Sequence, residues 1–117
     1  MKNQAFLQRV GYAVAGCKVA FRSESSFRTH VAAAVGTLFS LCVITPRPVW
    51  WAIIVLVIAL VLALEMLNTA LEFALDGLHP ERADFVRHAK DCAAGGVFLL
   101  SGGAVAVYAF MLWDTFR

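Results

Sequence analysis

The sequence predicts an all-α integral membrane protein, in which an N-terminal amphipathic surface helix is followed by three transmembrane helices. Two observations support this fold class: 61% of the 117 residues are hydrophobic against 15% charged, and the uncharged residues gather in three long runs. The mean hydropathy of +0.74 indicates that lipid is the solvent for much of the surface. Three membrane-crossing helices use most of the chain, so we expect residues 1–117 to form a single membrane-embedded domain.

The segment from Lys2 to Arg22 is expected to be the surface helix. Its apolar residues recur at helical spacing, opposite glutamines and basic residues. These apolar residues are Phe6, Val10, Ala13, Val14, Cys17 and Phe21. The pattern is typical of a helix that lies in the membrane interface. If the helix continued in register, Glu24 would point toward its apolar side, where a charge needs a partner or a metal ion.

The first transmembrane helix is expected from about Thr29 to Thr45, which is near the short limit for crossing the hydrocarbon. Pro46 and Pro48 close this helix and allow the next one to start at once. The second helix opens with Trp50 and Trp51, a pair typical of the aromatic belt at a membrane interface. We therefore expect a tight connection at the far side of the membrane.

The second helix is uncharged from Val49 to Leu64 and continues to about Leu78. Its length would be about 45 Å at a rise of 1.5 Å per residue. A hydrocarbon core is about 30 Å thick, so the last turns must emerge from it. A polar loop from His79 to Asp84 follows, and Pro80 marks the end of the helix. The third span is expected from about Cys92 to Trp113.

The distribution of basic residues indicates the orientation. Of the ten Lys and Arg residues, five precede the first span, three lie in the second loop region, and only Arg47 and Arg117 lie on the other side. This bias places the N-terminus and the second loop in the cytoplasm. The net charge of +2 is small and scattered, which argues against nucleic-acid binding. The three cysteines form no C-x-x-C pair, so neither a zinc site nor a disulfide framework is expected.

Four polar residues share one face of the second helix, because they are separated by three, four and four residues. They are Glu65, Asn68, Glu72 and Asp76. Ionisable groups at membrane depth are costly and rarely persist without a task or a partner. Glu65 lies about 25 Å along the helix from Pro48, near the cytoplasmic edge of the hydrocarbon. A ladder of carboxylates is therefore expected to run from lipid depth to the cytoplasmic side.

The cytoplasmic ends of the other helices bring charged groups to the same layer. Glu24 precedes the first span, and Lys90 and Asp91 precede the third. The layer thus offers oxygen ligands for Mg²⁺, a cation for phosphate and a carboxylate to orient or deprotonate a hydroxyl, as phosphoryl transfer requires. The competing interpretation is an electrostatic collar, in which the carboxylates pair with Arg28, Arg87 and Lys90 and only fix the depth of the helices.

The remaining polar residues carry less information. The chain has no G-x-x-x-x-G-K-[ST] loop and no H-R-D or D-F-G triplet, so side chains on helices would have to hold a nucleotide. Tyr12 lies on the polar side of the surface helix and is either an interfacial anchor or a nucleotide contact. His30, His79 and His88 show no joint metal spacing, and we assign them no catalytic role.

Three motifs together resemble the prokaryotic diacylglycerol kinase family, the small membrane enzymes that also include undecaprenol kinases. The motifs are E-x-x-F-R at 24–28, E-M-L-N-T-A-L-E at 65–72 followed by Asp76, and A-K-D at 89–91. The resemblance covers nearly the whole chain, and its E-x-L-N-[TS]-A-[IL]-E stretch is highly specific.

The resemblance implies an ATP- and Mg²⁺-dependent lipid kinase of the bacterial inner membrane, built as a homotrimer with active sites shared between neighbouring subunits. It implies that Glu65 is the general base toward the lipid hydroxyl and that Asn68 supports the catalytic geometry. Glu24 and Glu72 would hold Mg²⁺ with ATP. The nucleotide contacts would comprise Tyr12, Glu24, Glu72, Asp76, Glu81, Lys90 and Asp91.

Departures from the family pattern leave the lipid open between diacylglycerol and undecaprenol. The stretches at 27–34 and 93–97 look more like the undecaprenol kinase branch, and the enterobacterial diacylglycerol kinases usually have an acidic residue where His30 stands. The undecaprenol branch, however, usually has Asn where Ser26 stands. The resemblance also places Ala5 where the family has a basic nucleotide contact, so that contact has no assigned residue here.

One alternative from another functional class is a non-enzymatic oligomeric pore or proton pathway lined by the carboxylate ladder. Intramembrane acids do mark such pathways. A lumen, however, needs polar residues along the full span, and residues 49–64 offer none. The sequence therefore favours the lipid kinase.

Overall fold

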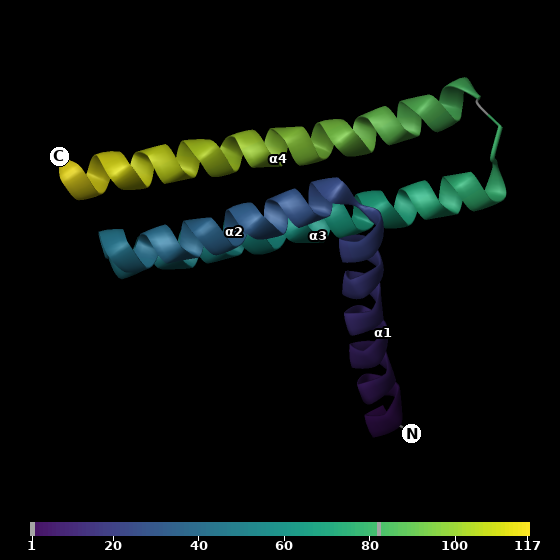
Figure 1. The fold of residues 1–117 in the computed structure, drawn as a ribbon, viewed down its shortest axis with the longest axis horizontal. Helices are drawn as coiled ribbons and strands as arrows, with labels where there is room; N and C mark the ends of the chain where they lie inside the picture. Colours follow the sequence, from purple (N-terminus) through teal and green to yellow (C-terminus); the bar gives the residue numbers. More distant parts are fainter. Residues whose placement is uncertain (1, 82) are drawn as a thin grey trace.

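The computed structural model, which describes residues 2–81 and 83–117, consists of helices and contains no β-strand over those residues. The helices are α1 (Lys2–Ser23), α2 (Ser25–Ile44), α3 (Pro48–Leu78) and α4 (Asp84–Phe116). The last three run alongside one another, and α1 projects away from them at its junction with α2 (Figure 1). The predicted all-helical class is confirmed.

Three helices, α2, α3 and α4, are long and apolar enough to cross a membrane by length and composition. α2 begins at Ser25 rather than near Thr29, and its 20 residues span about 30 Å, the thickness of a hydrocarbon core. α4 begins at Asp84, well before the predicted start at Cys92. Hydropathy marks the part of a helix that suits lipid, whereas helical hydrogen bonding continues through polar flanks. Both helices therefore extend beyond the predicted apolar spans, which lie almost entirely within them.

The backbone breaks for one residue at Glu24, between α1 and α2. Glu24 is extended, with φ −119° and ψ 111°, so the register of α1 does not continue into α2. The Arg28 guanidinium donates hydrogen bonds to the carbonyl oxygens of Phe21 at 2.7 Å and Arg22 at 3.1 Å. A cation at the C-terminus of α1 satisfies carbonyl groups that the helix leaves unpaired. The N-terminal helix is thus present, while its amphipathic character and its membrane surface position remain predictions.

The connection between α2 and α3 is tight, as predicted. Thr45 adopts a left-handed conformation with φ 51°, and its N–H donates to the Leu41 carbonyl at 2.8 Å. Pro48 opens α3. Arg47 Nη2 donates to Asp114 Oδ2 of α4 at 2.6 Å, and Trp50 Nε1 donates to the same oxygen at 2.9 Å. These bonds fix the α2–α3 turn against the C-terminal end of α4.

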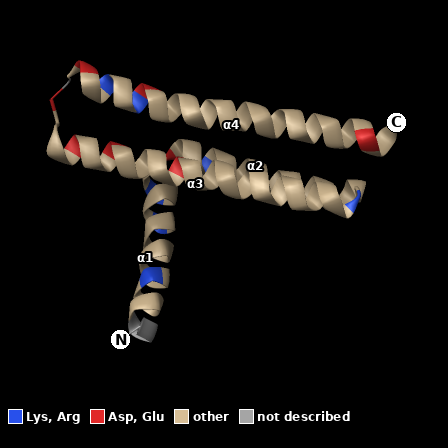
Figure 2. Cartoon of the chain, turned by 180° about the vertical axis from the view of Figure 1, so that it is seen from behind, with Lys and Arg blue, Asp and Glu red and all other residues tan. Residues whose placement is uncertain are grey.

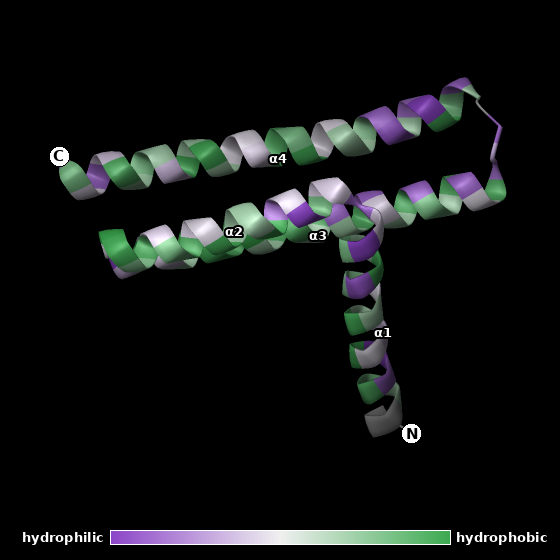
Figure 3. Cartoon of the chain, viewed as in Figure 1, coloured by the Kyte–Doolittle hydropathy of each residue, from purple (hydrophilic) through white to green (hydrophobic). Residues whose placement is uncertain are grey.

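α3 is the central helix, because it packs against both α2 and α4 while α2 and α4 make no close backbone approach within the described residues. Near the α2–α3 turn, Leu41, Ile54 and Met111 form a buried cluster. Elsewhere large apolar side chains face outward, such as Phe39, 71% exposed, and Phe98, 77% exposed. Hydrophobic residues predominate along the three long helices away from their charged end (Figure 3). An apolar exterior of this extent suits lipid or neighbouring protein chains.

Charged residues concentrate at one end of the three long helices and along α1, and the middle of these helices is almost free of them (Figure 2). At the opposite end Asp114 contacts both Arg47 and Arg117. The predicted layer of charged groups therefore has two parts: α1 and the start of α2 pack against α3, and the last turns of α3 pack against the start of α4.

Candidate functional site

Glu65 occupies the centre of the charged layer, on α3, and its side chain is only 2% exposed. The Ser26 hydroxyl of α2 donates a hydrogen bond of 2.7 Å to Glu65 Oε1. The His30 Nδ1 atom, one turn further along α2, lies 2.7 Å from the same oxygen. A buried carboxylate requires partners of this kind, because burial without them is costly.

His30 links Glu65 to α4. Its Nδ1 atom is at ion-pair distance from Glu65 but lacks the directionality of a hydrogen bond. Its Nε2 atom lies 3.3 Å from the Ser101 hydroxyl. A continuous polar path therefore runs from α3 through α2 to α4. Sequence reasoning missed Ser26, His30 and Ser101, although a histidine inside an apolar span was a usable signal.

Glu24 and Glu72 are brought together from the α1–α2 break and from α3. The pKa of the Glu24 carboxyl is raised above its ordinary value because it forms a hydrogen bond with Glu72. Burial and the negative charges of Glu72 and Glu65 act in the same direction, and Arg28 opposes them. Two neighbouring carboxylates repel each other when both are ionised, and a divalent cation between them would relieve that repulsion.

This pair fits the donor set that Mg²⁺ uses beside a nucleotide. Mg²⁺ typically takes one or two carboxylates and completes its octahedron with water and substrate phosphates. Among the described residues, no group of three or more His, Cys, Asp or Glu side chains is arranged to hold a metal ion. Glu24 and Glu72 are therefore the two carboxylates of this cluster that could hold a cation together.

Asn68 lies on α3 between Glu65 and Glu72, as its spacing predicted. Its Oδ1 atom is buried, and no residue in the described part of the chain donates a hydrogen bond to it. A buried amide oxygen without a donor is costly, and it is able to accept a hydrogen bond from a bound group. This position is compatible with the supporting role expected for Asn68.

Lys90 of α4 pairs with Asp76 of α3, with Nζ to Oδ1 at 2.7 Å. This one contact agrees with the collar interpretation. The other two cations do not pair with the carboxylates of α3. Arg28 donates to carbonyl groups at the end of α1, and Arg87 makes a long contact of 3.9 Å with Asp84 of its own helix. The Lys90 side chain is 35% exposed, so its ammonium group remains accessible to a phosphate.

Three predicted nucleotide contacts do not join this cluster within one chain. Tyr12 is 71% exposed on the projecting α1, about 18 Å along the helix from Glu24. Glu81 is exposed in the loop after α3, where its carbonyl oxygen lies 3.2 Å from His79 Nδ1. Asp91 is exposed on α4. Their predicted roles would require a ligand or a neighbouring subunit to approach them.

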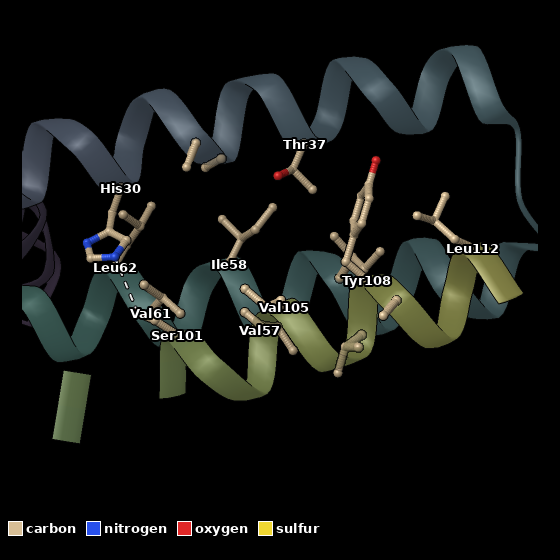
Figure 4. Close-up of a pocket in the computed structure, with 16 residues that line it drawn as sticks. His30, Thr37, Val57, Ile58, Val61, Leu62, Ser101, Val105, Tyr108 and Leu112 are labelled. Carbon is tan, nitrogen blue, oxygen red and sulfur yellow. Dashed lines mark hydrogen bonds between the residues drawn. The ribbon is translucent and has the colours of Figure 1, made fainter. Parts of the chain in front are cut away.

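An apolar cleft of about 500 Å³ extends from the charged layer between α2, α3 and α4. His30 and Ser101 line its polar end, and Thr37 and Tyr108 lie further along (Figure 4). The remaining lining is mostly Ala, Val, Ile and Leu. From Ser101 to Leu112 the cleft follows about 16 Å of α4, roughly half the thickness of a hydrocarbon core.

The sequence profile of the prokaryotic diacylglycerol kinase family matches residues 11–112. The chain belongs to this family. Together with its three apolar helices, this membership identifies a multi-pass membrane protein of a lipid kinase family. The resemblance inferred from the three sequence motifs is thereby confirmed.

Relatives in the family carry two kinds of name. The chain is 36% identical over 97 residues to a diacylglycerol kinase of Synechocystis, covering 82% of this chain and 55% of that protein. It is 37% identical over 76 residues to the undecaprenol kinase of Bacillus subtilis, covering 65% of this chain and 62% of that one. The diacylglycerol kinase of Escherichia coli is 24% identical over 110 residues, with coverage of 94% and 90%. The chain thus spans little more than half the length of the first two relatives.

Proposed function

We propose that this protein is an ATP- and Mg²⁺-dependent lipid kinase that phosphorylates the hydroxyl group of diacylglycerol or of undecaprenol. The observation that carries the proposal is the meeting of Glu24 and Glu72 beside the buried Glu65, at the polar end of an apolar cleft. The names of its family relatives support the same reaction class. The identities to a diacylglycerol kinase and to an undecaprenol kinase are similar, so sequence identity does not favour one lipid substrate over the other.

In this mechanism Glu24 and Glu72 hold Mg²⁺ together with the nucleotide. When bound, the metal neutralises charge that develops on the transferring phosphoryl group. Both carboxylates must be ionised to bind it, so the neighbouring Glu72, which raises the pKa of Glu24, makes metal binding and proton binding at Glu24 compete. Asn68, between the two acids on α3, completes the polar wall of the site.

Lys90 supplies the cation for the nucleotide phosphates. Its contact with Asp76 holds the ammonium group near the site in the absence of a ligand. An incoming phosphate replaces Asp76 as the anionic partner, a simple exchange between exposed groups. Tyr12, Glu81 and Asp91 contribute further nucleotide contacts, and their exposure suits approach from a neighbouring subunit.

Glu65 acts as the general base that accepts the proton of the lipid hydroxyl. The lipid chain lies in the apolar cleft, with its hydroxyl at the end lined by His30 and Ser101. The hydroxyl oxygen then forms a bond to the γ-phosphorus, and the bond from this phosphorus to the bridging oxygen breaks with its electron pair leaving on ADP.

The working unit in this proposal is a homotrimer in the bacterial inner membrane, with the N-terminus and the α3–α4 loop in the cytoplasm. The large apolar side chains exposed on α2 and α4 provide surfaces for subunit packing as well as for lipid. The pore hypothesis receives no support, because the α3 residues that line the cleft are Ile54, Val57, Ile58, Val61 and Leu62, all apolar.

A reconstitution assay tests the proposal. Purified protein in mixed detergent and lipid micelles receives Mg-ATP with either diacylglycerol or undecaprenol, and the phosphorylated lipid is measured. We expect Mg²⁺-dependent phosphorylation of at least one lipid, and the ratio of kcat/KM values identifies the preferred one. Folded, trimeric protein that phosphorylates neither lipid would contradict the proposal.

A further inference from the structure

His30 stands between the buried carboxylate and the cleft. None of the predicted site residues lines the cleft among the residues described, whereas His30 and Ser101 do. The Glu65 side chain is 2% exposed and that of His30 is 25% exposed. His30 lies at the end of the cleft next to Ser101 (Figure 4). A hydroxyl group entering from the cleft therefore meets the imidazole before it meets the carboxylate.

The two ring nitrogens of His30 have different neighbours. Nδ1 lies 2.7 Å from Glu65 Oε1 and faces α3, while Nε2 faces α4 and lies 3.3 Å from the Ser101 hydroxyl. The carboxylate favours the tautomer that carries its proton on Nδ1, which leaves the lone pair of Nε2 available. A lipid hydroxyl that replaced the Ser101 hydroxyl as the donor to Nε2 would be in place to pass its proton to this nitrogen.

We infer that His30 is a catalytic residue that relays the proton of the lipid hydroxyl to Glu65. This inference rests on the proposed lipid kinase function and refines the route by which its base acts. A carboxylate that orients an imidazole, which in turn contacts the attacking hydroxyl, is an arrangement that activates hydroxyl nucleophiles on unrelated folds.

The relay balances in protons and electrons. The lipid hydroxyl proton moves to His30 Nε2. Once the ring turns so that Nδ1–H points at the carboxylate 2.7 Å away, the Nδ1 proton moves to Glu65 Oε1, so the imidazole ends neutral and the carboxyl ends protonated. The hydroxyl oxygen attacks the γ-phosphorus, and ADP leaves with the electron pair of the broken bond. Before the next turnover the Glu65 proton returns to His30 Nδ1 and the Nε2 proton passes to solvent, which restores the starting tautomer and the ionised carboxylate. The hydrogen bond from Ser26 keeps Glu65 in position throughout.

The first test replaces His30 with Gln, which keeps a polar side chain but cannot pass a proton. Loss of a general base typically costs about 10²–10⁴-fold in rate. We expect a loss of this size in kcat for lipid phosphorylation, while the dissociation constant of Mg-ATP stays that of the wild type. His88→Gln is the matched control, because His88 is an exposed histidine on α4 with no predicted role. Wild-type kcat in His30→Gln would overturn the relay.

The second test separates proton transfer from a merely structural role. In His30→Ala the cleft has room for a free imidazole molecule, so added imidazole should restore lipid phosphorylation in a saturable manner. It should not restore Glu65→Gln, which retains its own imidazole. A folded His30→Ala protein, verified by circular dichroism and size-exclusion chromatography, that imidazole leaves inactive would overturn the relay. If His30→Ala does not fold, kcat of His30→Gln decides.

The wild-type protein in the same assay distinguishes the two proposals. If the wild type phosphorylates lipid but His30→Gln keeps the wild-type kcat, or imidazole fails to restore folded His30→Ala, the relay is wrong and the lipid kinase proposal stands. If the folded wild type phosphorylates no lipid, the proposed function itself fails.

Discussion

Replacing Glu65 with Gln is the most direct perturbation of the proposed chemistry. The amide keeps the size of the side chain and an oxygen that accepts the hydrogen bond donated by Ser26 at 2.7 Å. It removes the acidic group that lies 2.7 Å from His30 Nδ1. Because the amide keeps an acceptor oxygen for the buried contacts, the change should cost little in folding stability.

The expected loss of turnover follows from the role of a general base. Such a group typically contributes about 10²–10⁴-fold to the rate. At about 1.36 kcal/mol for each factor of ten, this loss raises the activation barrier by about 2.7–5.4 kcal/mol. The binding of Mg-ATP should change little, since Glu24, Glu72 and Lys90 remain in place.

Initial rates of lipid phosphorylation at saturating Mg-ATP measure kcat, and a nucleotide titration measures binding. Asp84→Asn is a matched control, because the side chain of Asp84 is 90% exposed at the start of α4. Trimer content is compared by size-exclusion chromatography. Wild-type turnover in Glu65→Gln would refute the assignment of Glu65 as the base.

Three further outcomes follow from other contacts. Glu72→Gln should raise the Mg²⁺ concentration for half-maximal activity by at least about 10–100-fold, a loss known even for second-shell changes at metal sites; an unchanged Mg²⁺ titration would exclude Glu72 as a ligand. The raised pKa of Glu24 means that its protonated form favours the folded state. Its contribution to stability is present below its usual value of 4.5 and is lost as pH rises through the raised pKa, so metal-free thermal midpoints should fall over that range in the wild type and less in Glu72→Gln. Equal slopes for the two proteins would argue against the carboxyl pair. Asp114→Ala should lower the thermal midpoint by a few degrees, because it leaves Arg47 and Trp50 without their acceptor, while kcat should remain unchanged; a midpoint equal to that of the wild type would show that this contact does not hold the turn.

The sequence was most reliable where one local property decides the structure. The long apolar runs located the three membrane-spanning helices, and the helical period placed Glu65, Asn68, Glu72 and Asp76 on one side of α3. It was less reliable at helix ends, because the polar residues at the start of α2 and α4 continue the backbone hydrogen bonding outside the apolar run. Hydropathy also did not reveal the single extended residue at Glu24, because a break in the backbone hydrogen bonding leaves no mark in the apolar pattern.

The chain alone therefore determined the membrane class, the spans and the identity of the acids, since composition and periodicity are properties of consecutive residues. Only the tertiary structure decided which side chains meet. Ser26, His30 and Ser101 join Glu65 across three helices, and Glu72 meets Glu24 at the α1–α2 break. Such contacts depend on the rotation and crossing of packed helices, which residues more than 30 positions apart do not encode in any local pattern.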